Sequence, residues 1–356
     1  MSRFFSTDLK DLNPYIPGEQ PVSGGFVKLN TNESPFPPSP EVIKALDESR
    51  VSELRLYSDP TAKTLTDAIA RYYGVPSDSI VTSNGSDEIL AFIIKAFCKD
   101  RGLAFADVTY GFYEVFCKLF GVEFVTVPLD RDFKIDVNDY KGLSQNIIIA
   151  NPNAQTGVYI PVSDIKTLVS ENKERLVIID EAYVDFGGES VIPLTREYDN
   201  LVVVQTFSKS RSLAGARIGF MVADAALAAD VKKIKYSFNP YNLNRLSIFA
   251  GAAALADKEY FVKTTAEIIK NREFLTDSLK LMGFKVIDSK ANFVLASHGA
   301  ECGRDLYLAL KKEGVLVRHF PGGRIDDFIR ITVGSAEELA VLIQKLGIIL
   351  QGAENA

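Results

Sequence analysis

The chain has 356 residues, a formal net charge of −6 and a hydrophobic content of 47%. This length and hydrophobicity are sufficient for a large buried core and predict two domains. Because no block of lysines and arginines stands out, the electrostatic footprint of a nucleic-acid-binding protein is missing. We therefore expect small-molecule partners and no nucleic acid.

No stretch of the sequence approaches the ~20 apolar residues that a membrane span requires, so we expect no membrane partner. Residues 1–15 contain acidic residues and a proline before any apolar run, and therefore lack the core of a signal peptide. These features together predict a cytoplasmic location.

Cysteine and histidine are too sparse for most metal sites. The three cysteines, Cys98, Cys117 and Cys302, form no CxxC pair and have no histidine nearby in the sequence, which argues against a disulfide framework and a zinc site. With only His298 and His319 in the chain, Ser-His-Asp chemistry also has little material. We predict no metal, and if the protein is an enzyme, another group must move its protons.

The predicted elements begin after an irregular, proline-rich opening that extends to Pro40. Residues 79–84 are predicted as a strand and residues 87–98 as a helix with one apolar face. Short, β-branched runs bounded by turn residues follow at 122–129, 146–152, 175–183, 200–209 and 217–224. Such runs are typical of strands buried on both faces of a mostly parallel sheet, and the helices between them predict an α/β fold.

The carboxyl-terminal part is predicted as a separate, smaller α+β unit. The sequence turns polar around 239–245, and a long helical stretch without proline follows from about 246 to 283. The rest is predicted as a strand (285–297), a helix (303–314), two strands (315–320 and 328–334) and a final helix (335–350). We predict an N-terminal arm over 1–30, a large domain over 31–245 and a small domain over 246–356.

Asp180 is the first candidate for chemistry, since it ends an apolar run at the carboxyl end of a predicted strand, where open α/β sheets bind ligands. The run also matches the Walker-B pattern of nucleotide hydrolases. That interpretation requires a GxxxxGK[ST] loop, and the sequence contains no Gly-Lys pair; nor does it contain the GxG of a dinucleotide-binding fold. We therefore expect Asp180 to meet a cation such as a protonated pyridine nitrogen.

Lys209 directly follows the next strand-like run and is again expected at a carboxyl strand end. A lone lysine is usually a solvated surface residue. Here Thr206, Ser208 and Arg217 accompany it, and hydroxyls with a guanidinium are suited to a phosphate dianion. A lysine in a partly desolvated crevice favours its neutral amine, which can form a Schiff base and later carry a proton.

A second anion site is predicted where Gly85, Ser86 and Asp87 open the apolar helix after strand 79–84. Free backbone N–H groups and the positive end of the helix dipole attract anions at such a turn. Ordinary helix capping by Ser86 or Asp87 explains the same residues, so this motif is weak alone.

Several segments together resemble the fold-type I pyridoxal-phosphate (PLP) aminotransferases, class II, and within them the histidinol-phosphate aminotransferases. The segments are LNPYIPGEQ, KLNTNESPFPPSP, RLYSDPTAKTL, ADVTYGFYEV, IIDEAYVDF, TFSKSRSLAGARIGF and FIRITVG. They extend from about Asn13 to Gly334. The opening segment with Tyr15 is more particular to this family, whereas the other motifs occur in sister enzymes.

The resemblance implies PLP as cofactor and a role for each matched residue. Lys209 would hold PLP as a Schiff base and shuttle a proton, and Asp180 would keep the pyridine nitrogen protonated. Tyr183 would hydrogen-bond the 3′-oxygen, and Tyr110 would stack on the ring, although a core aromatic is an equally good interpretation of Tyr110. The phosphate would be held by Gly85, Ser86, Thr206, Ser208 and Arg217, with Tyr57 from the second subunit of a homodimer, and Asp87 would be a further cofactor-binding residue.

One motif departs from the family pattern. The family usually carries an asparagine-containing turn that ends Pro-Thr-Gly, whereas residues 151–157 read NPNAQTG, with Gln155 in place of proline. Asn153 is the asparagine expected to pair with the 3′-oxygen, and the altered turn leaves its register open. Loss of the proline predicts a modest cost in stability.

Arg330 and Arg318 lie on neighbouring predicted strands of the small domain, and one of them could serve in a surface ion pair. By resemblance, Arg330 would bind the carboxylate of glutamate and the phosphate of histidinol phosphate in turn, assisted by Arg318 and by Tyr15 from the second subunit. Guanidinium groups bind either anion in a bidentate manner.

The implied reaction is amino transfer between histidinol phosphate and 2-oxoglutarate, giving imidazole-acetol phosphate and glutamate in L-histidine biosynthesis. An aromatic amino-acid aminotransferase and a threonine-phosphate decarboxylase of the same fold remain alternatives. A PLP-binding regulatory module is a further one, disfavoured because no DNA-binding segment precedes Asn13.

Overall fold

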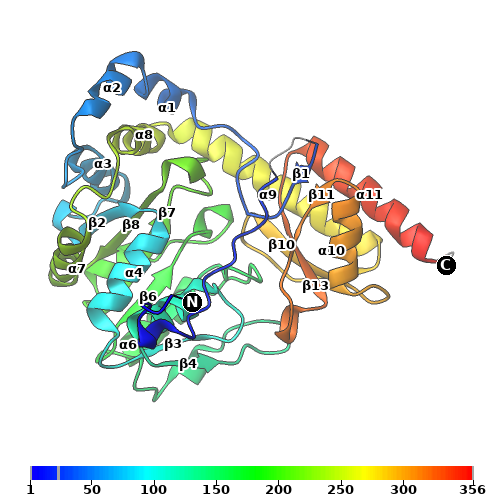
Figure 1. Ribbon diagram of the computed structural model, residues 1–356, viewed down its shortest axis with the longest axis horizontal. Helices are drawn as coiled ribbons and strands as arrows, with labels where there is room; N and C mark the ends of the chain where they lie inside the picture. Colours follow the sequence, from blue (N-terminus) through cyan, green and yellow to red (C-terminus); the bar gives the residue numbers. More distant parts are fainter. Residues whose placement is uncertain (1, 22–24, 355–356) are drawn as a thin grey trace.

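The computed structural model describes residues 2–21 and 25–354; Met1, residues 22–24 and the last two residues, which belong to the predicted arm and small domain, lie outside the described residues. Figure 1 shows two units connected by the long helix α9 (Lys258–Leu281), with the N-terminal segment passing between them. The predicted α/β fold is confirmed, because the larger unit is built on a mostly parallel sheet covered by helices.

The large sheet positions the site. Over the described residues it has seven strands, in the order β2 (Ile80–Asn84), β8 (Ile218–Ala223), β7 (Leu201–Thr206), β6 (Val177–Asp180), β5 (Asn146–Ala150), β3 (Leu103–Ala106) and β4 (Phe124–Val127). Only β8 runs antiparallel to its neighbours. The carboxyl ends of the other strands therefore lie along one edge, beside the start of β8.

Alternating side chains bury both faces of this sheet. In β7, Val202 and Val204 join the core on one face, while Leu201 and Val203 join the core on the other. The first face is covered by α4 (Ser86–Phe97) and α5 (Phe112–Phe120), and the second by α3 (Lys63–Tyr73), α6 (Val162–Glu171) and α8 (Arg245–Ala256). The remaining helices of this unit are α1 (Pro40–Ala45), α2 (Glu48–Ser52) and α7 (Ala225–Phe238).

The smaller unit holds an antiparallel sheet in the order β12 (Arg318–His319), β13 (Phe328–Thr332), β10 (Phe293–His298) and β9 (Phe284–Val286). Helices α10 (Gly303–Lys312) and α11 (Ala336–Glu354) pack beside it with α9. A short parallel pair joins β1 (Val27–Lys28) to β11 (Val315–Leu316), so the N-terminal segment is tied to this unit.

Some expected elements differ from the structure. Run 122–129 forms an edge strand, β4, with two exposed residues instead of a strand buried on both faces, and strand β3 was not predicted. The helical stretch 246–283 is two helices, because Asp257 ends α8 and caps α9 by accepting a hydrogen bond from the N–H of Tyr260. Stretch 285–297 is two strands.

The predicted division at residue 246 falls one residue inside α8, a helix that packs against α1 and α3. The element that leaves the large unit is α9. The division into an arm and two domains therefore stays a prediction, and the structure offers Asp257 as an alternative boundary. No helix among residues 2–21 and 25–354 is long and apolar enough to cross a membrane.

Candidate active site

A pocket with a volume of ≈ 380 Å³ opens at the carboxyl edge of the large sheet, between the two units. Asp180 ends β6, Thr206 ends β7, and Ser86 begins α4 after β2. The predicted residues in the pocket wall are Tyr15, Ser86, Asp87, Tyr110, Asp180, Tyr183, Thr206, Ser208, Lys209, Arg217, Arg318 and Arg330. Strand direction therefore gathers Ser86, Asp180 and Thr206, and the arm and the smaller unit add Tyr15, Arg318 and Arg330.

Asp180 is buried and held by two hydrogen bonds. Its Oδ2 accepts from the hydroxyl of Tyr113 at 2.8 Å, and its Oδ1 accepts from the N–H of Ala182 at 3.2 Å. Burial raises the pKa of Asp180 to about 6, while the two hydrogen bonds act in the opposite direction. A cation beside this carboxylate would relieve the cost of its burial.

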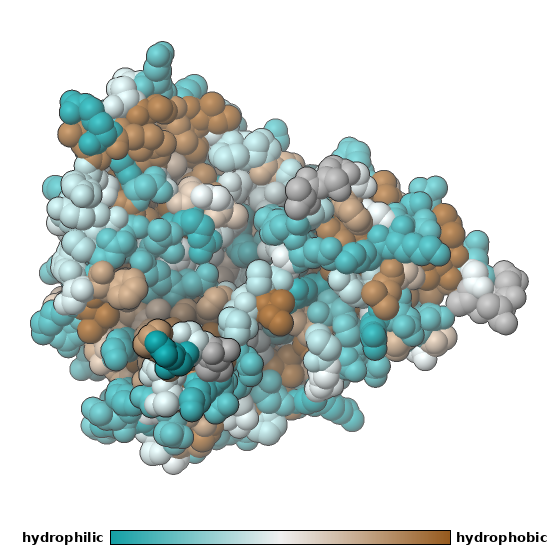
Figure 2. Space-filling view, in the orientation of Figure 1, coloured by the Kyte–Doolittle hydropathy of each residue, from teal (hydrophilic) through white to brown (hydrophobic). Residues whose placement is uncertain are grey.

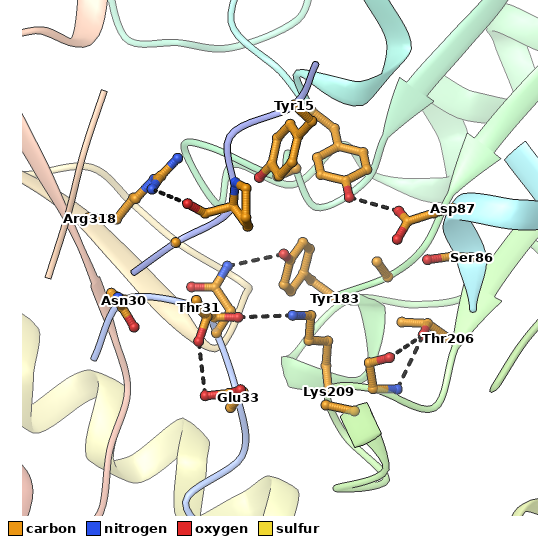
Figure 3. Close-up of a pocket in the computed structure, with 18 of the residues that line it drawn as sticks. Tyr15, Asn30, Thr31, Glu33, Ser86, Asp87, Tyr183, Thr206, Lys209 and Arg318 are labelled. Carbon is orange, nitrogen blue, oxygen red and sulfur yellow. Dashed lines mark hydrogen bonds between the residues drawn. The ribbon is translucent and has the colours of Figure 1, made fainter. Parts of the chain in front are cut away.

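Lys209 lies in the same pocket and is half-buried. Its Nζ donates to the carbonyl oxygen of Thr31 at 3.1 Å, as Figure 3 shows. Burial and the positive charge of Arg330 together lower the pKa of Lys209 to about 8, while the negative charge of Glu33 acts in the opposite direction. Much of the amine is therefore neutral near pH 8, which is the form that attacks an aldehyde.

Tyr183 is positioned by Asn32, which donates from Nδ2 to the tyrosine hydroxyl at 3.0 Å (Figure 3). Asn32 has a φ of 56°, in the left-handed region, and its own oxygens accept from Thr332 and Asn292 of the smaller unit. The Tyr183 hydroxyl accepts this hydrogen bond, so its own proton is still available to be donated to another group.

The predicted anion end combines a glycine turn with hydroxyls and a guanidinium. Gly85 has a φ of +81°, and a Cβ there would lie 2.4 Å from Nη2 of Arg217. The hydroxyl of Thr206 donates to that of Ser208 at 3.0 Å, and Arg217 pairs with Asp87 at 3.2 Å. Donors from three segments therefore face one end of the pocket.

Residues 25–346 match the family model of class I and II aminotransferases. A histidinol-phosphate aminotransferase of Brachyspira hyodysenteriae is 49% identical over 354 residues, covering 99% of this chain and 100% of the relative. The chain belongs to the histidinol-phosphate aminotransferases.

A second relative and a solved structure are also similar to this aminotransferase. Histidinol-phosphate aminotransferase 1 of Bradyrhizobium diazoefficiens is 49% identical and covers 97% of this chain and 99% of the relative. The crystal structure of histidinol-phosphate aminotransferase from Sinorhizobium meliloti, in complex with pyridoxal-5′-phosphate, has a TM-score of 0.88 at 23% identity, with 99% of both chains covered. The latter likeness shows the fold alone.

The other end of the aminotransferase pocket carries two arginines. Arg318 donates to the carbonyl oxygens of Pro17 at 3.1 Å and Ile16 at 2.8 Å. Arg330 is half-buried and donates from Nη1 to the carbonyl oxygen of Ala154 at 3.0 Å. Burial lowers the pKa of Arg330, yet a guanidinium remains charged in proteins.

Tyr15 corrects one expectation. The sequence reading took this residue from a second subunit, whereas the structure places Tyr15 of the same chain in the pocket wall. Its ring stacks on Phe112 at a centroid distance of 4.4 Å, and the segment that follows is held by Arg318. The N-terminal arm therefore packs on its own chain, because Phe112 and Arg318, which hold it, belong to the same subunit.

Three predicted residues, Asn153, Tyr57 and Gly85, are not part of the pocket wall. Asn153 is buried, donates to the carbonyl oxygen of Val108, and accepts from the backbone N–H groups of Gln155 and Thr156, so it stabilises its own turn. The expected pairing of Asn153 with the cofactor is therefore corrected, because its side-chain amide is bonded to backbone groups. Tyr57 is 79% exposed and stacks on Tyr241. Gly85 forms the turn between β2 and α4, and its lack of a Cβ leaves room for the guanidinium of Arg217.

Sequence reasoning missed residues of the pocket and its support. These are Asn30, Thr31, Asn32, Glu33, Tyr113 and Gln155. The segment KLNTNESP belonged to the family resemblance, so it contained a signal, although no single residue was assigned. Among the described residues, no group of three or more His, Cys, Asp or Glu side chains could hold a metal ion.

Proposed function

We propose that this aminotransferase binds PLP in the pocket and transfers the amino group of histidinol phosphate to 2-oxoglutarate, giving imidazole-acetol phosphate and glutamate. The reaction belongs to L-histidine biosynthesis. The observation that carries the proposal is the meeting of Asp180 and Lys209 in one pocket of a chain 49% identical to histidinol-phosphate aminotransferases. A cytoplasmic location stays a prediction.

The donor set of the pocket fits PLP. Asp180, a buried carboxylate that forms no ion pair with any residue in 2–21 or 25–354, suits a protonated ring nitrogen. The groups that would hold the phosphate are the N-terminus of α4 with Ser86, and Thr206, Ser208 and Arg217. When bound, PLP supplies an electron sink for the charge that develops on the substrate carbon. Arg217 would then exchange Asp87 for the phosphate.

Lys209 is proposed as the residue that binds the cofactor covalently and carries the proton of the substrate carbon. The lowered pKa of its amine supports both tasks, since a base with a pKa near the working pH accepts and releases protons readily. Tyr183, with its hydroxyl held by Asn32, is proposed to donate its proton toward the cofactor oxygen. No histidine lines this pocket.

Arg330 and Arg318 are proposed to bind the substrate anions. Figure 3 shows Arg318 on the side of the pocket opposite Ser86 and Thr206, and Arg330 belongs to the same pocket wall. The ring of Tyr15 contacts that of Tyr110 edge-on at a centroid distance of 6.0 Å. A planar guanidinium matches the two oxygens of a carboxylate and two oxygens of a phosphate, which supports alternate use by glutamate and histidinol phosphate.

A homodimer is proposed to complete the site. Exposed apolar side chains gather over α1, α2 and the segment that follows, at the upper left of Figure 2. They are Ile43, Val51, Leu54, Leu56 and Tyr57. Such a patch marks a protein interface, and a second copy would bring Tyr57 to the phosphate end of its partner's pocket. Sedimentation of the wild type and of Leu54→Glu would test this.

The substrate is tested with a panel read by absorbance. The purified enzyme should be yellow, and histidinol phosphate without an acceptor should convert the cofactor to its amine form. Equal conversion by phenylalanine would assign an aromatic amino-acid aminotransferase instead. Release of carbon dioxide from threonine phosphate would assign the decarboxylase, and a protein that stays colourless with PLP would end the enzyme proposal.

A further inference from the structure

Gln155, the residue that stands where the family usually has proline, lies in the pocket wall next to Arg330. Its backbone N–H donates to Oδ1 of Asn153 at 2.9 Å, which holds the turn. Its side-chain Oε1 accepts from Nη1 of Arg330 at 3.1 Å. The side chain is 7% exposed, so its orientation is set by these contacts and by packing.

The orientation of the Gln155 amide follows from the chemistry of its partner. Arginine carries only donors, so the atom that faces Nη1 must be the amide oxygen. The amide nitrogen Nε2 is consequently turned away from the guanidinium. It makes no hydrogen bond to any other residue in 2–21 or 25–354, and it stays available as a neutral donor at the Arg330 end of the pocket.

Arg330 is hydrogen-bonded through Nη1 on one side and, within the described part of the chain, has unpaired donors on the other. Nη1 donates to the carbonyl oxygen of Ala154 and to Gln155, which uses both of its protons. The rings of Phe293 and Phe320 lie 5.0 and 5.1 Å from Cζ and restrict the guanidinium plane. Nε is buried and has no hydrogen-bond partner among the described residues. The edge formed by Nε and Nη2 is therefore the one left for an anion.

We propose that Gln155 determines how the enzyme distinguishes a phosphate monoester from a carboxylate. Oε1 holds the Nε–Nη2 edge of Arg330 toward the substrate, and Nε2 supplies a donor that the third oxygen of a phosphate uses. A carboxylate has two oxygens in one plane, which the arginine edge satisfies alone. This inference rests on the proposed function, because it concerns the same two substrates.

Three variants separate the two tasks of Gln155. Gln155→Met retains the length of the side chain and removes both polar groups. Gln155→Glu retains an acceptor for Arg330 but replaces the donor with a negative charge. Gln344→Met is the matched control, because Gln344 is exposed on α11 outside the pocket. Cofactor content is measured by absorbance in each protein, so that differences in loading are removed.

The measurement is kcat and KM for histidinol phosphate and for glutamate in separate half-reactions. Gln155→Met should lower kcat/KM for histidinol phosphate about tenfold more than for glutamate, the loss of one hydrogen bond to a charged group, and mainly through KM. Gln155→Glu should lose more of this selectivity than Gln155→Met, because the negative charge of the glutamate repels the phosphate dianion of histidinol phosphate. Gln344→Met should match the wild type.

Two results would overturn the inference in different ways. Equal losses for both substrates in Gln155→Met would reduce Gln155 to a support for Arg330, and unchanged kinetics would remove any role. Inorganic phosphate provides a second readout, since its competition with histidinol phosphate should weaken in Gln155→Glu. A wild type that does not react with histidinol phosphate would instead refute the proposed function.

Discussion

The hydroxyl of Tyr113 donates to Oδ2 of Asp180 over 2.8 Å, from helix α5 to the end of β6. Both groups are buried, and the hydrogen bond favours the charged form of the carboxylate. Tyr113 thereby acts on the protonation state of a residue that we assign to the cofactor. It is a positioning residue, because it lies outside the pocket wall.

Replacement of Tyr113 by phenylalanine should therefore raise the pKa of Asp180 above its present value of about 6. The carboxylate fraction then falls at pH 6 to 7 and recovers at higher pH. We expect PLP binding by the apoenzyme to weaken roughly tenfold below pH 7 and to approach the wild type above pH 8. Fluorescence titration across pH 5.5–8.5 measures this, and superimposable curves would contradict the role of Tyr113.

Lys209 should be the residue that borohydride fixes to PLP. The trapped fraction should rise with pH through about 8, because the neutral amine increases as the pH passes the pKa of Lys209. Lys235 provides an internal control, since burial lowers its pKa to about 8 as well, but it lies in a different cavity. If peptide mapping finds equal label on both lysines, Lys209 is not the specific residue that binds PLP.

The loss of the Lys209 amine should also abolish turnover. We expect Lys209→Ala to lower kcat by at least about 10³-fold, the scale of a lost acid–base group, with the thermal midpoint within a few degrees of the wild type. Single-turnover absorbance with histidinol phosphate measures the rate. Retention of a tenth of the activity would exclude the proton-carrying role.

Asn32 combines a backbone constraint with a side-chain role, and two variants separate them. Asn32→Gly retains the φ of 56° and loses the hydrogen bond to Tyr183, whereas Asn32→Ala loses both. The free energy of unfolding of Asn32→Ala should be about 1 kcal/mol lower than that of Asn32→Gly, because a residue with a Cβ pays this cost in the left-handed conformation. Urea unfolding measures this difference. Both variants should lose activity to a similar extent, and a fully active glycine variant would dismiss the contact to Tyr183.

The raised pKa of Glu181 should make the stability of the protein depend on pH. It is buried behind the sheet, accepts from Ser190, Val191 and Gln205, and burial raises its pKa to about 7. The folded chain then retains a proton that the unfolded chain releases, so this residue makes the protein lose stability as pH rises from about 4.5 to 7.

Glu181→Gln should remove that dependence, which amounts to at most about 3 kcal/mol. The check is the free energy of unfolding in urea at pH 5.5 and pH 8, with Glu189→Gln as an exposed control. The difference between the two pH values should shrink in Glu181→Gln alone. An identical pH dependence in all three proteins would show that Glu181 does not hold a proton.

Arg330→Ala should weaken capture of both substrates while the cofactor stays bound. The expected fall in kcat/KM is roughly two orders of magnitude, and Arg330→Lys should restore only part of it, since an ammonium lacks the planar fork. Arg304→Ala, on the surface of α10, is the control. Unchanged kinetics in Arg330→Ala would refute the anion-binding role.

Much of the fold and the chemical centre could be predicted from local patterns. Asp180 and Lys209 follow apolar, β-branched runs, and in a parallel sheet the ends of such runs meet at one edge. Tyr113 could not be found in this way, because it lies on the core-facing side of an aromatic-rich helix, where a buried ring is the ordinary expectation. Asn32 lies in a segment without periodicity.

Asn153 shows where the local pattern failed. Asparagine in a turn can face a ligand or bind its own backbone, and the sequence is the same in both cases. In the folded chain Asn153 binds the backbone of its own turn. Gln155, two residues further on, lies in the pocket wall instead.

Residue types and their spacing along the chain were enough to predict the α/β class, the family and the groups that can react with an aldehyde or an anion. The partners of those groups became visible in the folded chain. Thr31 reaches Lys209 and Gln155 reaches Arg330 across separations of more than 170 residues. Such contacts depend on how two sheets and a long helix pack, and they set the burial that shifts each pKa.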